Sequence, residues 1–219
     1  MSKMMKNIAV IEHPLVSHYL TILRDKNTQS FEFKQTVDIL SYILASVYYA
    51  ELKTEKVNIT TPLKATTGYR INQNLVLLPI LRAGLGLTRG FIDLFPTIKI
   101  SHIGLYRDEE SLKPIKYYFK FPKLKDKKET KVIILDPMIA TGGSVIFTLE
   151  YLINMGFKNI SVVSLLMAPE AIKAIDNRFG NTERKYFNIY TCSIDEKLNE
   201  KGFIVPGLGD AGDRMFGTV

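Results

Sequence analysis

One stretch of the sequence indicates both the fold and the chemistry, and it reads Val132-Ile133-Ile134-Leu135-Asp136-Pro137-Met138-Ile139-Ala140-Thr141-Gly142-Gly143-Ser144. Its four consecutive aliphatic residues are typical of a strand that is buried on both faces of a parallel sheet. An acidic residue, a loop of small residues and an amphipathic segment follow in that order. The stretch therefore predicts a strand over 131–135, a glycine loop, and a helix over 144–155 that stops at Gly156.

The same alternation of short apolar runs and amphipathic segments continues on both sides of this stretch. It predicts strands over 75–81, 99–106, 131–135, 160–167 and 187–193, and helices over 33–52, 85–95, 144–155 and 169–178. Strands that alternate with helices in this way build α/β folds. We therefore expect a mostly parallel central sheet flanked by helices.

Two segments depart from the alternation. Residues 107–128 are polar and rich in lysine and contain two prolines, which favours an exposed β-hairpin arm. The end of the chain, about 194–219, carries glycines at 202, 207, 209, 212 and 217, together with apolar residues that can pack. We expect it to form an irregular, ordered, glycine-rich C-terminal cap. No linker divides the chain, so residues 1–219 are predicted to form a single domain.

The composition excludes several classes of protein. Of the 219 residues, 46% are hydrophobic and 23% are charged, which is typical of a globular domain and not of a disordered or fibrous chain. The strongest apolar run, Leu75–Leu81, is too short to cross a bilayer, so no membrane partner is expected. With no secretory signal and one cysteine, Cys192, a reducing cytoplasmic location is expected.

The net charge of +7 is concentrated in one segment. Residues 113–131 hold eight lysines and two acids, a local charge of 8 − 2 = +6. A nucleic-acid interface would spread its basic residues over a face, so this distribution argues against a nucleic-acid partner. The segment is either a solvated arm or a loop that attracts anions to a nearby site.

The glycine loop has the properties of a phosphate site. Gly142 and Gly143 allow the backbone to bend and present its N–H groups to an anion, and Thr141 and Ser144 add hydroxyl donors. The start of the following helix adds a partial positive charge. Asp136, at the carboxyl end of its strand, can accept hydrogen bonds from a pair of ribose hydroxyls. The loop lacks the lysine of a Walker A motif and the spacing of a dinucleotide-binding motif.

Four motifs extend this pattern into a family resemblance: residues 79–86 (PILRAGLG), 106–110 (YRDEE), 136–144 (DPMIATGGS) and 205–214 (VPGLGDAGDR). They resemble the type I phosphoribosyltransferases, and in particular the uracil phosphoribosyltransferase family. The opening His13-Pro14-Leu15-Val16 matches as well. Pro137 stands where many type I relatives have a second acid, as it does in the uracil-specific family.

The resemblance implies transfer of 5-phosphoribose from its 1-diphosphate (PRPP) to N1 of uracil, giving UMP and pyrophosphate in pyrimidine salvage. Mg²⁺ would be bound together with PRPP, without a protein metal site of its own. Arg82 and Arg107 would hold the pyrophosphate, because a guanidinium grips phosphate oxygens through paired hydrogen bonds. The 5′-phosphate and ribose would be bound by Asp136, Pro137, Met138, Ile139, Ala140, Thr141, Gly142, Gly143 and Ser144.

By the same resemblance, Ile204, Gly209, Asp210 and Ala211 contact uracil, and Asp210 also lies near PRPP or its metal. Asp210 and Arg107 are the expected catalytic residues. Either Asp210 removes the N1 proton or the acidity of uracil itself suffices. Backbone groups can match the edge of uracil where cytosine would place a donor against a donor.

Other interpretations remain open at this point. An RNA-binding regulator with the same fold would use the lysines and aromatic residues of the arm, Tyr117, Tyr118, Phe119 and Phe121, although these aromatics are better explained by packing on a partner subunit. An enzyme for another base is disfavoured by the cap motif. The resemblance further implies a homodimer or larger homo-oligomer and, as in some members, GTP as an activator. The three histidines, His13, His18 and His102, are scattered and are expected to be structural.

Overall fold

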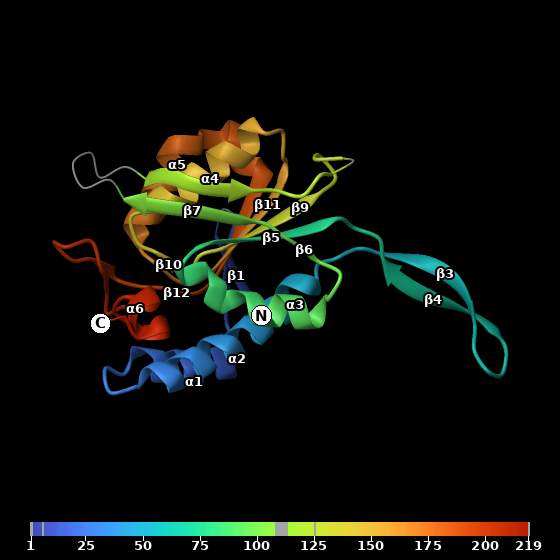
Figure 1. Cartoon of the computed structure of the whole chain (residues 1–219), viewed down its shortest axis with the longest axis horizontal. Helices are drawn as coiled ribbons and strands as arrows, with labels where there is room; N and C mark the ends of the chain where they lie inside the picture. Colours follow the sequence, from blue (N-terminus) through green and yellow to red (C-terminus); the bar gives the residue numbers. More distant parts are fainter. Residues whose placement is uncertain (1, 6, 108–113, 125, 219) are drawn as a thin grey trace.

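A computed structural model of the protein describes residues 2–5, 7–107, 114–124 and 126–218 (Figure 1). Its main sheet follows the order β1-β2-β12-β11-β9-β5-β7-β8, with two short strands, β6 and β10, beside it. Strands β2, β12, β11, β9, β5 and β7 are mutually parallel, whereas β1 and β8 are antiparallel at the two edges. The bounds are β1 Ser2–Met5, β2 Ile8–Ile11, β5 Leu75–Leu81, β6 Lys99–Ile100, β7 His102–Arg107, β8 Pro114–Lys120, β9 Lys131–Leu135, β10 Met138–Ile139, β11 Asn159–Met167 and β12 Phe187–Ile194.

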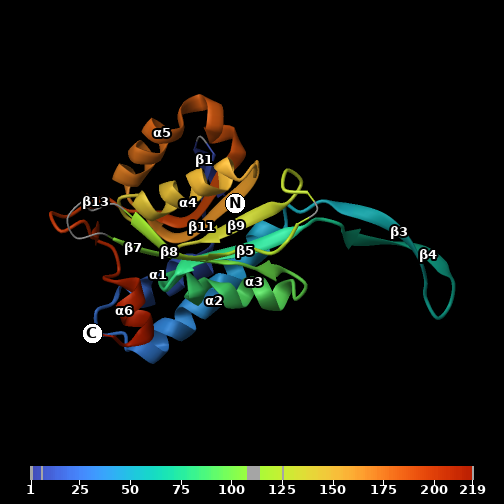
Figure 2. The same cartoon turned by 45° about the horizontal axis from the view of Figure 1, so that its top comes forward.

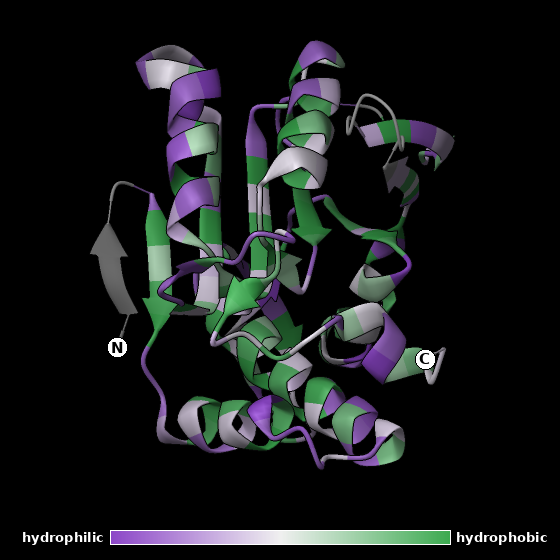
Figure 3. Ribbon diagram, turned by 90° about the vertical axis from the view of Figure 1, so that its left-hand side faces the viewer, coloured by the Kyte–Doolittle hydropathy of each residue, from purple (hydrophilic) through white to green (hydrophobic). Residues whose placement is uncertain are grey.

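Helices cover both faces of this sheet (Figures 1 and 2). One face carries α1 (Pro14–Arg24), α2 (Ser30–Tyr49), the 3₁₀ helix η1 (Ala83–Leu87) and α3 (Thr88–Leu94). The other carries α4 (Gly143–Asn154) and α5 (Pro169–Glu183), after which comes the 3₁₀ helix η2 (Arg184–Tyr186). Figure 3 shows the central strands largely in hydrophobic green and the outward turns of the helices in purple.

Successive residues of each central strand pack alternately into two separate hydrophobic cores, one on each face of the sheet. Leu77 and Ile133 pack toward α1 and α2, whereas their neighbours Leu78 and Ile134 pack toward α4 and α5. Successive strand side chains point to opposite faces, so a sheet covered on both sides needs an unbroken apolar run. This explains why 131–135 and 75–81 are so uniformly aliphatic, and both strands occupy their predicted bounds.

The other predicted elements are present with small shifts. The strand expected over 99–106 is interrupted at Ser101, whose N–H donates to the carbonyl of Leu77, giving β6 and β7. The helix expected over 85–95 begins as a 3₁₀ turn and continues as α3, and α5 extends to Glu183 across a break at Gly180. The fold class predicted from the sequence, a mostly parallel sheet flanked by helices, is confirmed.

The lysine-rich segment contributes to a β-hairpin, as expected over 107–128, but this hairpin lies against the core instead of projecting from it. Strand β8 runs antiparallel to β7 along the edge of the main sheet, and Phe119 and Phe121 pack against the core beneath α4. Phe119 meets the ring of Tyr151 edge-on at 4.7 Å between centroids. These two phenylalanines are partly buried within their own chain, and their packing on a partner subunit stays a prediction. Residues 108–113 and 125 lie outside the described residues.

The projecting hairpin of the molecule lies elsewhere in the chain. Strands β3 (Thr54–Thr60) and β4 (Ala65–Ile71) pair only with each other and extend away from the body (Figures 1 and 2). Their residues are mostly polar and alternate weakly, so the sequence pattern did not predict this hairpin. Leu63 at its tip is 94% exposed and Tyr69 is 66% exposed.

The end of the chain is ordered and largely irregular, as predicted. It contains the two-residue strands β13 (Lys197–Leu198) and β14 (Ile204–Val205) and the short helix α6 (Ala211–Phe216). Helix α6 packs beside α2, with Ala211 and Met215 in the core. Among the described helices, none combines the length and apolar character needed to cross a membrane.

Candidate functional site

The glycine loop lies at the carboxyl edge of the parallel sheet, between β9 and α4. After Asp136 the chain forms β10, which pairs with β11, and then turns through Thr141 into the helix. Gly142 is the N-cap residue of α4 and has φ +83°, a left-handed conformation that residues with a Cβ rarely adopt. No side-chain hydrogen bond caps the helix start at Gly142. The first N–H groups of α4 are therefore directed toward this end of the sheet.

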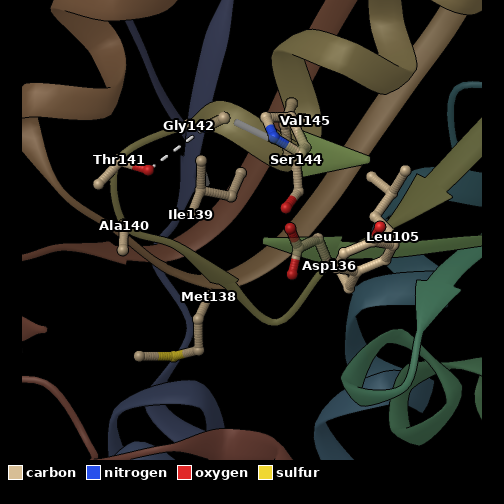
Figure 4. Close-up of a pocket in the computed structure, with 12 residues that line it drawn as sticks. Leu105, Asp136, Met138, Ile139, Ala140, Thr141, Gly142, Ser144 and Val145 are labelled. Carbon is tan, nitrogen blue, oxygen red and sulfur yellow. Dashed lines mark hydrogen bonds between the residues drawn. The ribbon is translucent and has the colours of Figure 1, made fainter. Parts of the chain in front are cut away.

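A cavity of about 220 Å³ opens over this loop (Figure 4). Figure 4 shows the side chains of Asp136 and Ser144 pointing toward one another across it, with Met138 directed away. The N–H of Gly143 is 3.5 Å from Oγ1 of Thr141. The cavity is lined by Leu105, Tyr106, Pro114, Asp136, Met138, Ile139, Ala140, Thr141, Gly142, Gly143, Ser144 and Val145.

The carboxyl group of Asp136 has a strongly shifted pKa. Burial raises the pKa of its carboxyl group to about 7, and a hydrogen bond from the backbone of Met138 opposes part of that rise. A carboxylate held among apolar strand ends is poorly solvated, so it gains from any ligand that donates hydrogen bonds to it. Vicinal hydroxyl groups would supply such donors.

A second cavity, of about 330 Å³, lies between this loop and the cap. It shares Asp136, Met138 and Ala140 with the first cavity, so the two adjoin. The remaining lining residues come from the start of η1 and from the cap, and they are Ala83, Lys201, Gly202, Phe203, Ile204, Gly209, Asp210, Ala211 and Gly212. Two connected compartments can hold the two halves of a large substrate or two different substrates.

Most of the predicted site residues meet here. Ile204, Gly209, Asp210 and Ala211 all line the cap cavity, and eight of the nine residues predicted from 136 to 144 line the loop cavity. The ninth, Pro137, lines neither: it is buried, and its carbonyl accepts hydrogen bonds from Leu165, Leu166 and Ser164 of β11. Pro137 fixes the loop to the sheet.

Asp210 lines the cap cavity, whereas Arg82 lies beside it, next to the lining residue Ala83. Arg82 precedes Ala83 at the end of β5, and its side chain is 59% exposed. Asp210 is the N-cap residue of α6, where its Oδ1 accepts the N–H of Asp213 at 2.9 Å. Arg107 ends β7, directly after Leu105 and Tyr106 of the loop cavity, and its side chain lies outside the described part of the structure.

Sequence reasoning missed some lining residues. Tyr106 belongs to the YRDEE motif, which predicts no site role for it. Leu105 and Pro114 carry no sequence signal, because only the β7–β8 pairing brings them to the loop. Lys201 and Phe203 reach the cap cavity through a turn closed by the side chain of Asn199.

The described residues give no separate metal centre. No group of three or more His, Cys, Asp or Glu side chains among them could hold a metal ion. His13, one of the three scattered histidines, accepts the N–H of Leu15 at the start of α1, which is a structural role.

Comparison with known proteins agrees with this geometry. The model of the uracil phosphoribosyltransferase family matches residues 10–218. The uracil phosphoribosyltransferase of Finegoldia magna is 46% identical over 215 residues, which cover 98% of this chain and 100% of the relative. That of Dictyoglomus turgidum is 46% identical over 212 residues, covering 96% and 99%.

Solved structures share the fold of this chain. The structure of the AQ2163 protein from Aquifex aeolicus superposes with a TM-score of 0.86 at 33% identity, covering 95% of this chain and 97% of that one. An adenine phosphoribosyl transferase from Trypanosoma brucei, solved with AMP, pyrophosphate and ribose-5-phosphate, has a TM-score of 0.60 at 13% identity, covering 94% and 89%, and so shares the fold. With a family match over nearly its whole length and full-length relatives at 46% identity, the chain belongs to the uracil phosphoribosyltransferase family.

Proposed function

We propose that the protein transfers the 5-phosphoribosyl group of PRPP to N1 of uracil, giving UMP and pyrophosphate. The observation that carries this proposal is the meeting of the loop cavity and the cap cavity at Asp136. A phosphate bound by the loop and a base bound in the cap would place the ribose between them, beside this carboxylate. The relatives' names supply the identity of the base.

The loop is suited to the 5′-phosphate. Backbone N–H groups at the start of α4 and the hydroxyls of Thr141 and Ser144 lie at a cavity whose described lining residues include no lysine. Asp136 would accept hydrogen bonds from the two ribose hydroxyls, which favours its charged form and offsets the desolvation that raises its pKa.

In the reaction, the bond from C1′ of PRPP to the diphosphate oxygen breaks, the bond from C1′ to N1 of uracil forms, and the N1 proton leaves. Negative charge accumulates on the departing pyrophosphate, so fixed positive groups beside it lower the barrier. Arg82 at the end of β5 and Arg107 at the end of β7 are the groups that we assign to this role. Asp210, in the wall of the cap cavity, is the carboxylate that we assign to accept the N1 proton.

Mg²⁺ bound to the diphosphate supplies further charge neutralisation when it is present. The donor set fits an ion that arrives with the substrate, because the described residues provide isolated carboxylates rather than a three-ligand cluster. Asp210 is the side chain that would reach such an ion from the cap cavity.

Base recognition is assigned to the cap backbone. Gly209 has φ +79° and lies between Leu208, which is buried, and Asp210. A chain of this kind can approach a flat ring closely and offer N–H and C=O groups to its edge. Uracil presents an acceptor, a donor and an acceptor, whereas cytosine would leave buried polar groups unpaired.

The projecting hairpin supports assembly into a homodimer or larger homo-oligomer. A two-stranded hairpin is marginally stable by itself, and Leu63 and Tyr69 leave large apolar surfaces exposed on it. We propose that β3 and β4 pack against a second copy of the chain. Sedimentation of the wild type and of Tyr69→Glu tests this, with a monomeric wild type as the contradicting result.

The function is tested by measuring UMP formation from uracil, PRPP and Mg²⁺, with Asp136→Asn as the matched variant. Turnover by the wild type and a large loss in the variant are expected. Equal turnover in both would contradict the assignment of Asp136. Adding GTP to the same assay tests activation by this nucleotide, which the family resemblance implies for some members.

A further inference from the structure

An ion pair that joins α1 to the end of β12 lies behind the cap. The guanidinium of Arg24 contacts the carboxylate of Asp195 through two hydrogen bonds, Nη2 to Oδ1 at 2.6 Å and Nη1 to Oδ2 at 2.7 Å. The side chain of Asp195 is 2% exposed and that of Arg24 is 25% exposed. A paired geometry of this kind, largely removed from water, is stronger and more rigid than a surface ion pair.

Both partners also bind the backbone of Gly207. The N–H of Gly207 donates to Oδ2 of Asp195 at 2.9 Å, and its carbonyl accepts from Nη1 of Arg24 at 2.9 Å. Ser193 adds a fourth hydrogen bond to the carboxylate, at 3.0 Å. The backbone N–H of Asp195 is itself fixed to the carbonyl of Met167 in β11. Gly207 is thus tied through two side chains to the central sheet.

Gly207 occupies a critical place in the cap. It is buried, lies outside every strand and has φ +61°, and a Cβ there would stand 2.1 Å from the carbonyl oxygen of Ile204. Ile204 before it and Gly209, Asp210 and Ala211 after it line the cap cavity. A buried backbone N–H and C=O need partners, and here side chains supply what a sheet would otherwise provide. The position of Gly207 consequently sets the distance between Ile204 and the segment 209–211 in the lining of the cap cavity.

A second arginine holds the next residues in the same way. Arg214 of α6 donates to the carbonyls of Leu208 at 2.8 Å and of Asp25 at 2.7 Å, and also to those of Leu23 and Thr28. The carbonyls of residues 23 and 25 flank Arg24 at the end of α1. Helix α1, which is separated from the cap by about 180 positions in the sequence, is therefore its structural support.

The pKa of Asp195 is consistent with a permanently charged pair. Burial by itself would raise it, but the hydrogen bonds from Arg24, Gly207 and Ser193 hold it below its usual value. The lowered pKa favours the charged form of the Asp195 carboxylate.

We propose that Arg24 and Asp195 are positioning residues for base recognition, which act through the backbone of Gly207 and do not touch the substrate. This inference rests on the proposed function, since it assigns uracil to the cap cavity. It predicts that loosening the pair damages use of the base and leaves use of PRPP, bound mainly by the loop, nearly unchanged.

The test compares Arg24→Lys with the matched control Arg89→Lys. A lysine keeps the charge but cannot hold both carboxylate oxygens and the Gly207 carbonyl in one plane. Arg89 forms an exposed ion pair with Asp38 at 3.2 Å on the same side of the sheet, away from the cavities. In Arg24→Lys we expect KM for uracil to rise about tenfold or more, because small displacements of substrate-positioning groups have effects of this size in enzymes. KM for PRPP should stay within about twofold of the wild type. Arg89→Lys should leave both constants unchanged.

Hydrogen exchange at the amide of Gly207 gives a readout that is independent of activity. In the wild type this amide should exchange as slowly as those of β12, and in Arg24→Lys at least about tenfold faster. An unprotected amide in the wild type would overturn the proposal even if the variant did not fold. So would an unchanged KM for uracil in a folded variant, or equal rises in both KM values. A wild type without uracil turnover would instead refute the proposed function.

Discussion

The guanidinium of Arg82 and the carboxylate of Asp213 face each other with Nη2 and Oδ1 3.5 Å apart, which joins the end of β5 to the first turn of α6. The two residues are neighbours of Ala83 and Gly212, which both line the cap cavity. The arginine assigned to pyrophosphate is therefore in contact with an anion of the cap.

Replacing Asp213 with Asn should improve the binding of PRPP. The pyrophosphate must compete with Asp213 for Arg82, whose side chain is 59% exposed, so the interaction lost is a weak surface pair. We expect KM for PRPP to fall by about two- to fivefold, the effect of a pair worth less than about 1 kcal/mol. Initial rates at saturating uracil measure it. Asp93→Asn, which removes a partner of Arg89, is the control, and a KM for PRPP that rose in Asp213→Asn would contradict the assigned role of Arg82.

The thermal stability of Asp136→Asn should depend on pH differently from that of the wild type. The pKa of Asp136 is about 7 in the folded protein, above its ordinary value of 3.8, so the folded state binds this proton more tightly than the unfolded chain. The group therefore reduces wild-type stability as pH rises from about 4 to about 7, and Asn escapes that loss. From pH 5 to pH 8, the variant's Tm should gain at least about 3 °C relative to the wild type, as about 1 kcal/mol produces in a chain of this size. A constant difference would contradict the raised pKa.

Use of PRPP should weaken on the acid side of neutrality. Only the ionised form of Asp136 accepts hydrogen bonds from both ribose hydroxyls, and below pH 7 that form becomes the minority. We expect KM for PRPP to rise about fivefold or more from pH 8 to pH 6 in the wild type. The diphosphate titrates in the same range, so the comparison is with Asp136→Asn, whose KM should be high throughout and change less. Parallel pH profiles in the two proteins would show that another group is responsible.

Alanine variants at two glycines with left-handed backbones distinguish an effect on ligand binding by the glycine loop from a general loss of stability. Gly142 has φ +83° in the loop, and Gly156 has φ +97° after α4, far from the cavities, with no atom within 4 Å of a built Cβ. Alanine at either position costs about 1–2 kcal/mol of stability. Only Gly142→Ala should also raise KM for PRPP, by about tenfold or more, because it alters the N–H groups offered to the phosphate. Thermal melts and initial rates of both variants measure this, and equal kinetics would count against phosphate binding at the loop.

The central part of the fold could be predicted because short, continuous stretches of the sequence determine it. Strands β5 and β9 are uniformly aliphatic, which a sheet covered on both faces requires, and Gly142 and Gly143 mark the turn into α4. The residues of the glycine loop are consecutive, so a single motif contains most of the residues that line the loop cavity.

The parts that escaped prediction depend on distant partners. The β3–β4 hairpin has no buried face within its own chain, and so shows no apolar alternation. The lysines and prolines of the segment around β8 predict an exposed β-hairpin arm, and they give no sign that Phe119 attaches this strand to the core. The start of α6 did carry a local signal, an Asp N-cap at Asp210 followed by Asp213. Nothing near Arg24 indicates that its partner is Asp195.

The central claim is most directly tested by measuring kcat/KM for uracil, cytosine, adenine and orotate, each with PRPP and Mg²⁺. A cap that reads the edge of uracil through backbone groups should give UMP efficiently, and should reject cytosine by about 10⁴-fold or more, since cytosine leaves buried polar groups unpaired. Comparable turnover of uracil and cytosine, or turnover only with another base, would contradict this account of the cap cavity.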